Sequence, residues 1–267
     1  MNTAEPTRRP GRVLWALLWI VSLVASLLLI LPFLNMLFPK TGAQALLSLD
    51  WSGYVVASDF TSPQPVIVGV SASWTVPKVN GSPKDSFSAA WVGIGGQLDD
   101  TLIQAGTEQD SMSGSESYSA WYELIPADAV TIAMNVSSGD RITASIDLLD
   151  SASNQWLIQV YDATNGQTFN ETFLYDTSRL TAEWIVERPT IDHSLSTLTD
   201  FGSITFTDAE AKTDGTGRTI SEFSSLQVIM HNRQNIPLVT VSSLSSDGSS
   251  FTVTYSTSAT TAASQGT

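Results

Sequence analysis

The chain has 267 residues, which is enough for one domain of about 200 residues with shorter appended segments. It contains no cysteine, which excludes disulfide bonds and thiol catalysis, and its two histidines, His193 and His231, lie too far apart to suggest a metal site. The formal net charge is −14, and because residues 1–40 hold four cations and one anion, the remaining residues carry −17. So acidic a domain repels nucleic acid, and no nucleic-acid partner is expected. An isoelectric point near 4.3 fits a protein that works in acid, but a merely soluble acidic domain fits as well.

An uninterrupted apolar segment at residues 13–31 has Ser22 and Ser26 as its only polar members, and its apolar character continues to Phe38. At about 1.5 Å per helical residue, this segment matches the ~30 Å hydrocarbon layer of a membrane. It is also longer than the roughly 7–15 apolar residues of a cleavable signal peptide. We therefore expect a transmembrane helix over residues 13–38.

The residues that flank this segment set its expected orientation. Arg8, Arg9 and Arg12 lie in a basic tail over residues 1–12, and a basic flank of this kind stays in the cytoplasm. The sequence thus predicts a single-pass protein of the cell membrane with its main domain outside the cell. The small residues Thr41-Gly42-Ala43 leave one alternative open, in which the segment is a signal peptide and the domain is secreted after cleavage.

The composition changes after an expected linker at residues 39–49. From residue 50 to 255, short runs rich in Val, Ile, Thr, Tyr and Trp alternate with turn-forming residues, and residues 256–267 form a Ser/Thr-rich tail. Many short strands without crossover helices predict an all-β fold, an antiparallel sandwich or barrel. The expected strands are Gly53–Ala57, Val66–Val76, Ser88–Ile94, Thr101–Gly106, Ser117–Leu124, Thr131–Val136, Arg141–Leu148, Gln155–Tyr161, Thr168–Leu174, Leu180–Val186, Gly202–Thr207, Ser225–His231, Leu238–Ser242 and Ser250–Tyr255.

One expected strand carries a carboxylate among bulky apolar residues. Because successive side chains of a strand point to opposite faces, Trp184 shares a core-facing side with its apolar neighbours, and Glu183 and Glu187 share the other side. A carboxylate in the middle of such a strand costs free energy unless it is solvated, hydrogen-bonded or protonated. An edge strand with one wet face is the simpler explanation.

Three more expected strands place polar or aromatic side chains together on one face. Gln104 alternates with apolar neighbours, Trp121 points the same way as Glu123, and Trp91 shares its face with Gly93 and Gly95. Tryptophan, glycine, glutamine and glutamate on sheet faces are what a solvated substrate groove across a sheet requires. Taken singly, each residue has an ordinary structural explanation.

Taken together, these segments resemble a known family, the eqolisins, which are glutamic peptidases. The resemblance covers about residues 50–255, in order and in rough spacing. Its motifs are Asp50-Trp51-Ser52-Gly53-Tyr54, Trp74-Thr75-Val76-Pro77, Ala90-Trp91-Val92-Gly93-Ile94, Ile103-Gln104-Ala105-Gly106, Ala120-Trp121-Tyr122-Glu123, Gly139-Asp140 and Ala182-Glu183-Trp184-Ile185-Val186-Glu187. A membrane-anchored member of prokaryotic type is the form that the anchor suggests.

The resemblance implies a fold and a set of site residues. The fold is a lectin-like, jelly-roll β-sandwich of two antiparallel sheets. The catalytic pair implied is Gln104 and Glu183, and Trp91, Trp121 and Glu123 match positions that line the cleft for a protein or peptide substrate. No metal and no cofactor are implied.

The chain departs from the fungal pattern at two positions. Gly95 and Ser119 stand where that pattern has aspartates, which would lie close to the catalytic pair. The resemblance therefore leaves the pH optimum open, because nearby carboxylates shift the pKa of a catalytic carboxyl group.

The function implied is that of an acid-acting endopeptidase. Without a metal or a covalent nucleophile, peptide hydrolysis needs an activated water and a donor for the developing oxyanion, roles that a glutamate and a glutamine can fill. A non-catalytic extracellular sandwich that binds glycan or peptide in the same groove is the alternative, and a surface protein with a decayed site is a third. The presence of both Gln104 and Glu183 favours the enzyme.

Overall fold

The structure is a computed structural model that describes residues 45–256. The expected tail, anchor and most of the linker before residue 45 lie outside the described residues, as does the C-terminal tail after residue 256. None of the helices within residues 45–256 is long and apolar enough to cross a membrane. The described residues belong to one compact unit.

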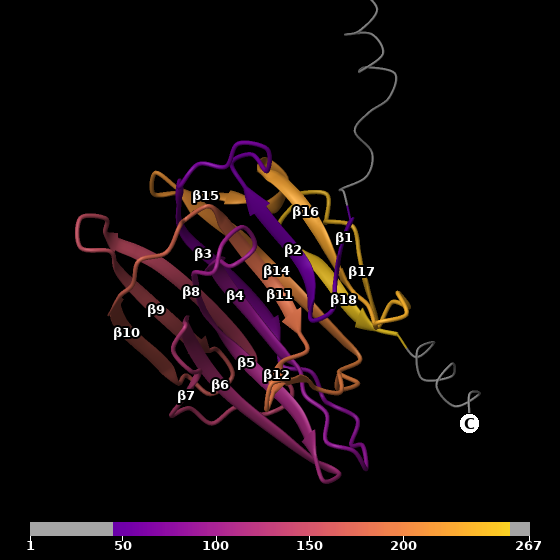
Figure 1. Cartoon of the computed structure of the whole chain (residues 1–267). Helices are drawn as coiled ribbons and strands as arrows, with labels where there is room; N and C mark the ends of the chain where they lie inside the picture. Colours follow the sequence, from indigo (N-terminus) through magenta and orange to yellow (C-terminus); the bar gives the residue numbers. More distant parts are fainter. Residues whose placement is uncertain (1–44, 257–267) are drawn as a thin grey trace, which may run out of the picture. The chain divides into compact units, whose positions relative to one another are not determined.

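The first sheet has eight strands in the order β1-β16-β2-β11-β4-β5-β6-β7 (Figure 1). β1 runs parallel to β16, and the other neighbours in this sheet pair antiparallel. The strands span β1 Ala45–Ser48, β2 Trp51–Ala57, β4 Ala89–Gly95, β5 Leu102–Met112, β6 Ser115–Ile125, β7 Val130–Ile132, β11 Thr181–Glu187 and β16 Ser224–Met230.

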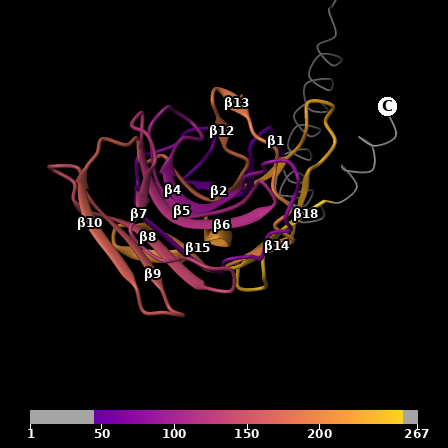
Figure 2. The same ribbon diagram turned by 90° about the horizontal axis from the view of Figure 1, so that it is seen from below.

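The second sheet packs against the first (Figure 2). Its strand order is β10-β9-β8-β3-β14-β18-β17, with β15 pairing β14. All its strand pairs are antiparallel. The strands span β3 Ile67–Thr75, β8 Arg141–Asp150, β9 Gln155–Asp162, β10 Thr168–Leu174, β14 Ser203–Thr213, β15 Thr216–Thr219, β17 Val239–Val241 and β18 Phe251–Tyr255. The remaining elements are the short pair β12 Thr190–Ile191 and β13 Ser194–Leu195 and the 3-10 helix η1 Ile220–Glu222.

The two-sheet, all-β sandwich predicted from the sequence is confirmed. Four short strands, β1, β12, β13 and β15, lie outside the predicted ones. β1 lies inside the segment predicted as a linker, where it pairs with the edge of β16. Its side chains are mostly exposed, with Leu47 more than half exposed, so burial contributes little to holding it. The strand forms because the unpaired backbone groups of an edge strand accept a neighbour, a property that the local sequence does not reveal.

Tryptophans hold the two sheets together across the core. Trp184 of β11 is fully buried between the sheets, as its position on the strand predicts, and its indole nitrogen donates to the Ser71 carbonyl of β3 at 2.9 Å. Trp74 of β3 makes the reverse connection, because its indole nitrogen donates to the Thr107 hydroxyl of β5 at 3.0 Å. The core-facing side of β11 is therefore fixed, and so is the opposite side that carries Glu183.

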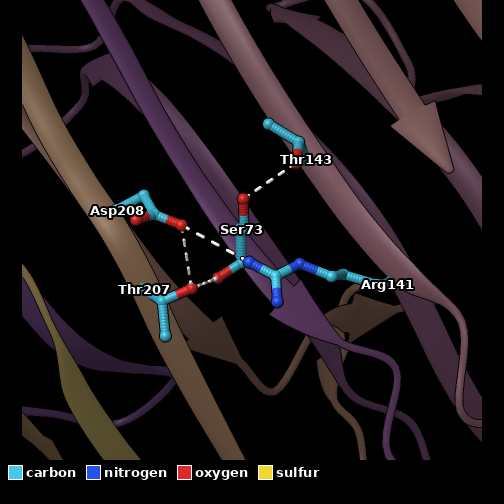
Figure 3. A network of polar contacts seen from close by, with 5 residues as sticks. All are labelled: Ser73, Arg141, Thr143, Thr207 and Asp208. Carbon is cyan, nitrogen blue, oxygen red and sulfur yellow. Dashed lines mark hydrogen bonds and ion pairs between the residues drawn. The ribbon is translucent and has the colours of Figure 1, made fainter. Parts of the chain in front are cut away.

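The outer face of the second sheet is polar and is bridged by hydroxyl groups (Figure 3). Ser73 of β3 bonds the Thr143 hydroxyl of β8 at 2.8 Å, and its carbonyl accepts from the Thr207 hydroxyl of β14. Asp208 sits at a register shift in β14 with a φ of 53°, and it lies 3.5 Å from the guanidinium of Arg141. An exposed ion pair of this kind stabilises by no more than about 1 kcal/mol. This face lies on the opposite side of the sandwich from the site described next.

Candidate active site

Four residues of the first sheet stand in one row across neighbouring strands. Glu183 of β11 is opposite Gly93 of β4, Gly93 is opposite Gln104 of β5, and Gln104 is opposite Glu123 of β6. Glu183 and Gln104 are thus two strand spacings apart, about 10 Å between backbones, with a residue between them that has no side chain. The register brings the sequence-predicted pair face to face.

The next two rows carry the other predicted residues on the same face. Trp91 of β4 is opposite Ile185 on one side and Gly106 on the other, and Gly106 is opposite Trp121. The last row is Glu187, Ala89, Glu108 and Ser119. Trp91, Trp121, Gln104, Glu123 and Glu183 therefore meet on one face, as predicted.

Only the nitrogen of the Gln104 side-chain amide is hydrogen-bonded to another described residue. Its nitrogen donates to Glu123 Oε2 at 2.5 Å, whereas its Oε1 is buried and finds no hydrogen-bond partner among residues 45–256. Both carboxyl oxygens of Glu183 are likewise buried without a partner in the described part of the chain. Leaving such a group unpaired costs about 1–3 kcal/mol, more when it is charged. Three acceptor oxygens are thus left free to bind a reacting water or substrate.

Burial controls the protonation of these carboxyl groups. It raises the pKa of Glu183 well above its usual value, the nearby Thr181 hydroxyl lowers that pKa in part, and the charge of Asp99 raises it further. Burial also raises the pKa of Glu123, against the lowering effect of its bond to Gln104. Glu183 consequently holds its proton to higher pH than an ordinary glutamate does.

The expectation of a solvated groove at the pair is wrong. Glu183 is 0% exposed and Gln104 is 3% exposed, because Trp91 and Leu102 crowd the glycine between them. β11 is also no edge strand, since it lies between β2 and β4. The alternation of side chains along a strand, or strand parity, gives the face on which a side chain lies. It does not show what covers that face.

Three cavities of about 500, 600 and 310 Å³ lie elsewhere on the sandwich, and neither Gln104 nor Glu183 lines any of the three. The site is therefore identified by its unpaired polar atoms and its register rather than by an open hollow. No cluster of three or more potential metal ligands occurs among the described His, Asp and Glu residues.

The two departures from the fungal pattern have local structural reasons. A side chain at Gly95 would bring its Cβ 2.2 Å from the Thr101 carbonyl, and the φ of Gly95 is +93°. No aspartate fits there in this backbone. Ser119 instead donates to Glu108 Oε2 at 2.9 Å, so its hydroxyl is occupied by a neighbouring carboxylate.

Two residues outside the predicted set of site residues also belong to this face. Glu187 accepts a hydrogen bond of 2.8 Å from the Trp91 indole, and Trp51 packs edge-to-face on the same indole with ring centroids 5.0 Å apart. The sequence held a signal for Glu187, because it shares the face of Glu183 two residues further along β11. Its bond to another strand becomes visible only in the register.

The sequence of the chain matches the Peptidase A4 family over residues 49–255. The chain belongs to this family, that of the glutamic peptidases. It is 30% identical over 233 residues to aspergillopepsin-2 of Aspergillus niger, a match that covers 78% of each chain. It is 27% identical over 204 residues to scytalidopepsin B of Scytalidium lignicola, covering 71% of this chain and 74% of the relative.

Solved structures agree with the fold. Aspergilloglutamic peptidase from Aspergillus niger is 32% identical and superposes with a TM-score of 0.57, covering 64% of this glutamic peptidase and 99% of the fungal chain. Scytalido-glutamic peptidase, solved with a peptide-based transition-state analogue, gives a TM-score of 0.65 at 22% identity and covers 78% of this chain and 99% of its own. The enzyme is thus a glutamic endopeptidase built on the sandwich described above.

Proposed function

We propose that this glutamic endopeptidase hydrolyses peptide bonds with Gln104 and Glu183 as its catalytic pair. One observation carries the proposal: the register sets the two side chains on either side of Gly93, and three of their oxygens are buried without partners in residues 45–256. Buried unpaired polar groups destabilise a fold, and they are retained where function needs them.

The chemistry proceeds by direct attack of water. Gln104 Oε1 and an ionised Glu183 hold the water, and Glu183 takes one of its protons while the water oxygen bonds the peptide carbonyl carbon. The second N–H of Gln104 stabilises the resulting oxyanion, because its first N–H is held by Glu123. Glu183 then gives its proton to the peptide nitrogen as the C–N bond breaks. No covalent intermediate with the enzyme forms.

Trp91, Trp121 and Glu123 are the residues that we assign to substrate binding. They share the face of the catalytic pair, and the Trp121 indole nitrogen is a buried donor without a partner in the described chain. A peptide carbonyl is the acceptor that an extended substrate offers at this place. Glu123 has the further role of orienting the Gln104 amide.

The pH dependence follows from the base role of Glu183. A general base acts only when it is ionised, and burial raises the pKa of Glu183 well above 4.5. Activity therefore increases with pH through that raised pKa, and the acid limb lies at higher pH than an ordinary glutamate would give.

The test is a proteolysis assay on the soluble domain, residues 44–267. Incubated with a denatured protein between pH 2 and pH 7, the domain is expected to cut internal peptide bonds, as mass spectrometry of the products reads out. Cleavage in H₂¹⁸O under single-turnover conditions introduces ¹⁸O directly into the new carboxyl group. An absence of cleavage over the whole pH range would defeat the proposed function.

We further propose a single membrane anchor at residues 13–38, with the peptidase domain outside the cell. The support is the apolar length and the arginines at 8, 9 and 12. Protease added to intact cells should remove the domain and leave a short membrane-bound fragment. Recovery of the entire domain in the medium, beginning near residue 44, would instead mean a cleaved signal peptide.

A further inference from the structure

We propose that Glu187 is a positioning residue of this peptidase: it fixes the Trp91 indole beside Gly93, in the row of Gln104 and Glu183, and so shields Glu183 from bulk solvent. The proposal rests on the proposed function, since it assumes that this pair is catalytic. It assigns a role to the one carboxyl group of β11 that the hydrolytic steps leave unused.

The Trp91 indole connects the two ends of this arrangement. Its nitrogen donates to Glu187 Oε2 at 2.8 Å, in the row of Ala89. Its far edge, at Cζ3, reaches the row of the catalytic pair, because a Cβ placed on Gly93 would lie 2.8 Å from that atom. In an indole, the nitrogen and Cζ3 lie at opposite ends of the ring system. The ring therefore lies along β4, held at one end by Glu187, with its other end beside Gly93 in the row of the catalytic pair.

The other neighbours of the Trp91 indole limit its movement but do not fix its position along the strand. A Cβ on Gly106 would lie 2.1 Å from the Ala90 carbonyl oxygen and 2.6 Å from Trp91 Cβ, so glycine at 106 permits the close approach of β4 at the base of the Trp91 side chain. Trp51 packs on it edge-to-face at an interplanar angle of 79°. The indole N–H is the directional contact, and Glu187 is its acceptor.

A glutamate suits this place because it is neutral in acid. Burial, together with the charges of Asp50 and Glu123, raises the pKa of Glu187 to about 7. Its bonds to the two indoles, of Trp91 and Trp51, act in the opposite direction. In mild acid the group is a carboxylic acid whose carbonyl oxygen accepts the indole N–H. An uncharged acceptor is thus sufficient.

The position of the indole affects catalysis because it determines how deeply Glu183 is buried. With the indole in place, Glu183 is fully enclosed and its pKa is raised. When the indole is released, bulk solvent reaches Glu183, and its pKa moves back toward that of an exposed glutamate. Displacement of the Trp91 indole also lowers kcat, because a shift of about 1 Å in the groups that position a substrate can cost up to about 10²-fold.

Two substitutions at Glu187 test whether the residue acts as the hydrogen-bond acceptor of the Trp91 indole or only fills space. Glu187→Gln keeps a neutral acceptor of the same size, whereas Glu187→Leu keeps the volume and removes the acceptor. Glu108→Leu is the matched control, because Glu108 lies in the same row on the other side of Ala89 and bonds Ser119 rather than an indole. Trp91→Phe removes the donor from the opposite side of the bond.

Glu187→Leu is expected to lower kcat by about 10-fold to 10²-fold with a smaller change in KM, and to move the acid limb of the kcat/KM profile toward pH 4.5. Glu187→Gln should restore most of kcat and leave the acid limb where it is in the parent. Glu108→Leu should stay within about twofold of the parent. Adding Trp91→Phe to Glu187→Leu should cost little more than the poorer single change. Equal losses in the Gln and Leu variants, or an unmoved acid limb in Glu187→Leu, would overturn the proposal.

A measurement that does not depend on activity keeps the two proposals apart. The indole ¹H–¹⁵N resonance of Trp91, assigned by its loss in Trp91→Phe, should shift in Glu187→Leu and stay nearly in place in Glu187→Gln. An unshifted resonance in Glu187→Leu overturns the positioning role even if Glu183 is confirmed as catalytic. Full activity of Glu183→Gln would remove the proposed function while leaving the indole contact intact.

Discussion

Glu183→Gln is expected to lower kcat/KM by at least about 10²-fold, because the amide keeps the size of the side chain but cannot carry a proton from water to the leaving nitrogen. The group is fully buried and its oxygens have no partner in residues 45–256, so no neighbouring side chain is placed to take over its role. Steady-state cleavage of a peptide substrate by the purified variant measures the loss.

Gln104→Ala is expected to cause a loss of similar size, about 10²–10³-fold, which is the effect of removing one oxyanion donor. Because the two side chains act on one water molecule, the double variant should be scarcely worse than the poorer single variant. Losses that multiply in the double variant would mean that the residues act in separate steps.

The folding of these variants is the necessary control. A buried glutamine is no costlier than a buried, protonated glutamate, and above the raised pKa of Glu183 it avoids a buried charge. Glu183→Gln should therefore be as resistant to urea as the parent in acid, and more resistant at pH 8. A variant that is both inactive and unstable at pH 5 would say nothing about catalysis, and Gln104→Ala would then decide.

The second large effect concerns stability. The free energy of unfolding is expected to fall by on the order of 3 kcal/mol or more between pH 4 and pH 8, a large share of the roughly 5–15 kcal/mol typical of a domain. Burial raises the pKa of Asp110 and that of Glu187 to about 7 each, from ordinary values of 3.8 and 4.5. Urea titrations across this range measure the change.

The sign follows from proton binding. Between its unfolded and folded pKa, each raised group binds more protons in the folded state, so stability is full below about pH 4 and is lost as pH approaches 7. Asp247, whose pKa is lowered to about 2 by hydrogen bonds, acts in the opposite sense but only below its ordinary 3.8. The double variant Asp110→Asn, Glu187→Gln should reduce the slope, and the part due to Glu183 should remain. A parent domain that gains stability from pH 4 to pH 8 would contradict this assignment.

Strand parity allowed much of this site to be predicted. The alternation in β11 put Trp184 in the core and Glu183 on the other face, and the structure confirms both. The same rule grouped Trp121 with Glu123 on β6. Parity works here because one face of each strand is buried in the inter-sheet core, so a slip by one residue would expose it.

Register and burial could not be read from the local sequence. That Gly93 lies between Glu183 and Gln104 depends on how three strands pair, and β11 is far from β4 and β5 in the chain. The enclosure of Glu183 depends on side chains of other strands, and the pairing of β1 depends on an edge offered by β16. The catalytic assignment was accessible only through the family resemblance, which carries that three-dimensional information indirectly.

The central claim is that Glu183 is the proton carrier of the peptidase, and its titration tests that claim most directly. In the domain labelled with ¹³C at glutamate Cδ, the signal lost in Glu183→Gln gives the pKa of Glu183 in the free enzyme, and the acid limb of kcat/KM reports the pKa of the essential base in that same state. The expected result is a single midpoint for both, well above 4.5, in line with the burial of the group. A Glu183 that titrates near 4.5, or an acid limb that follows a different midpoint, would contradict the claim.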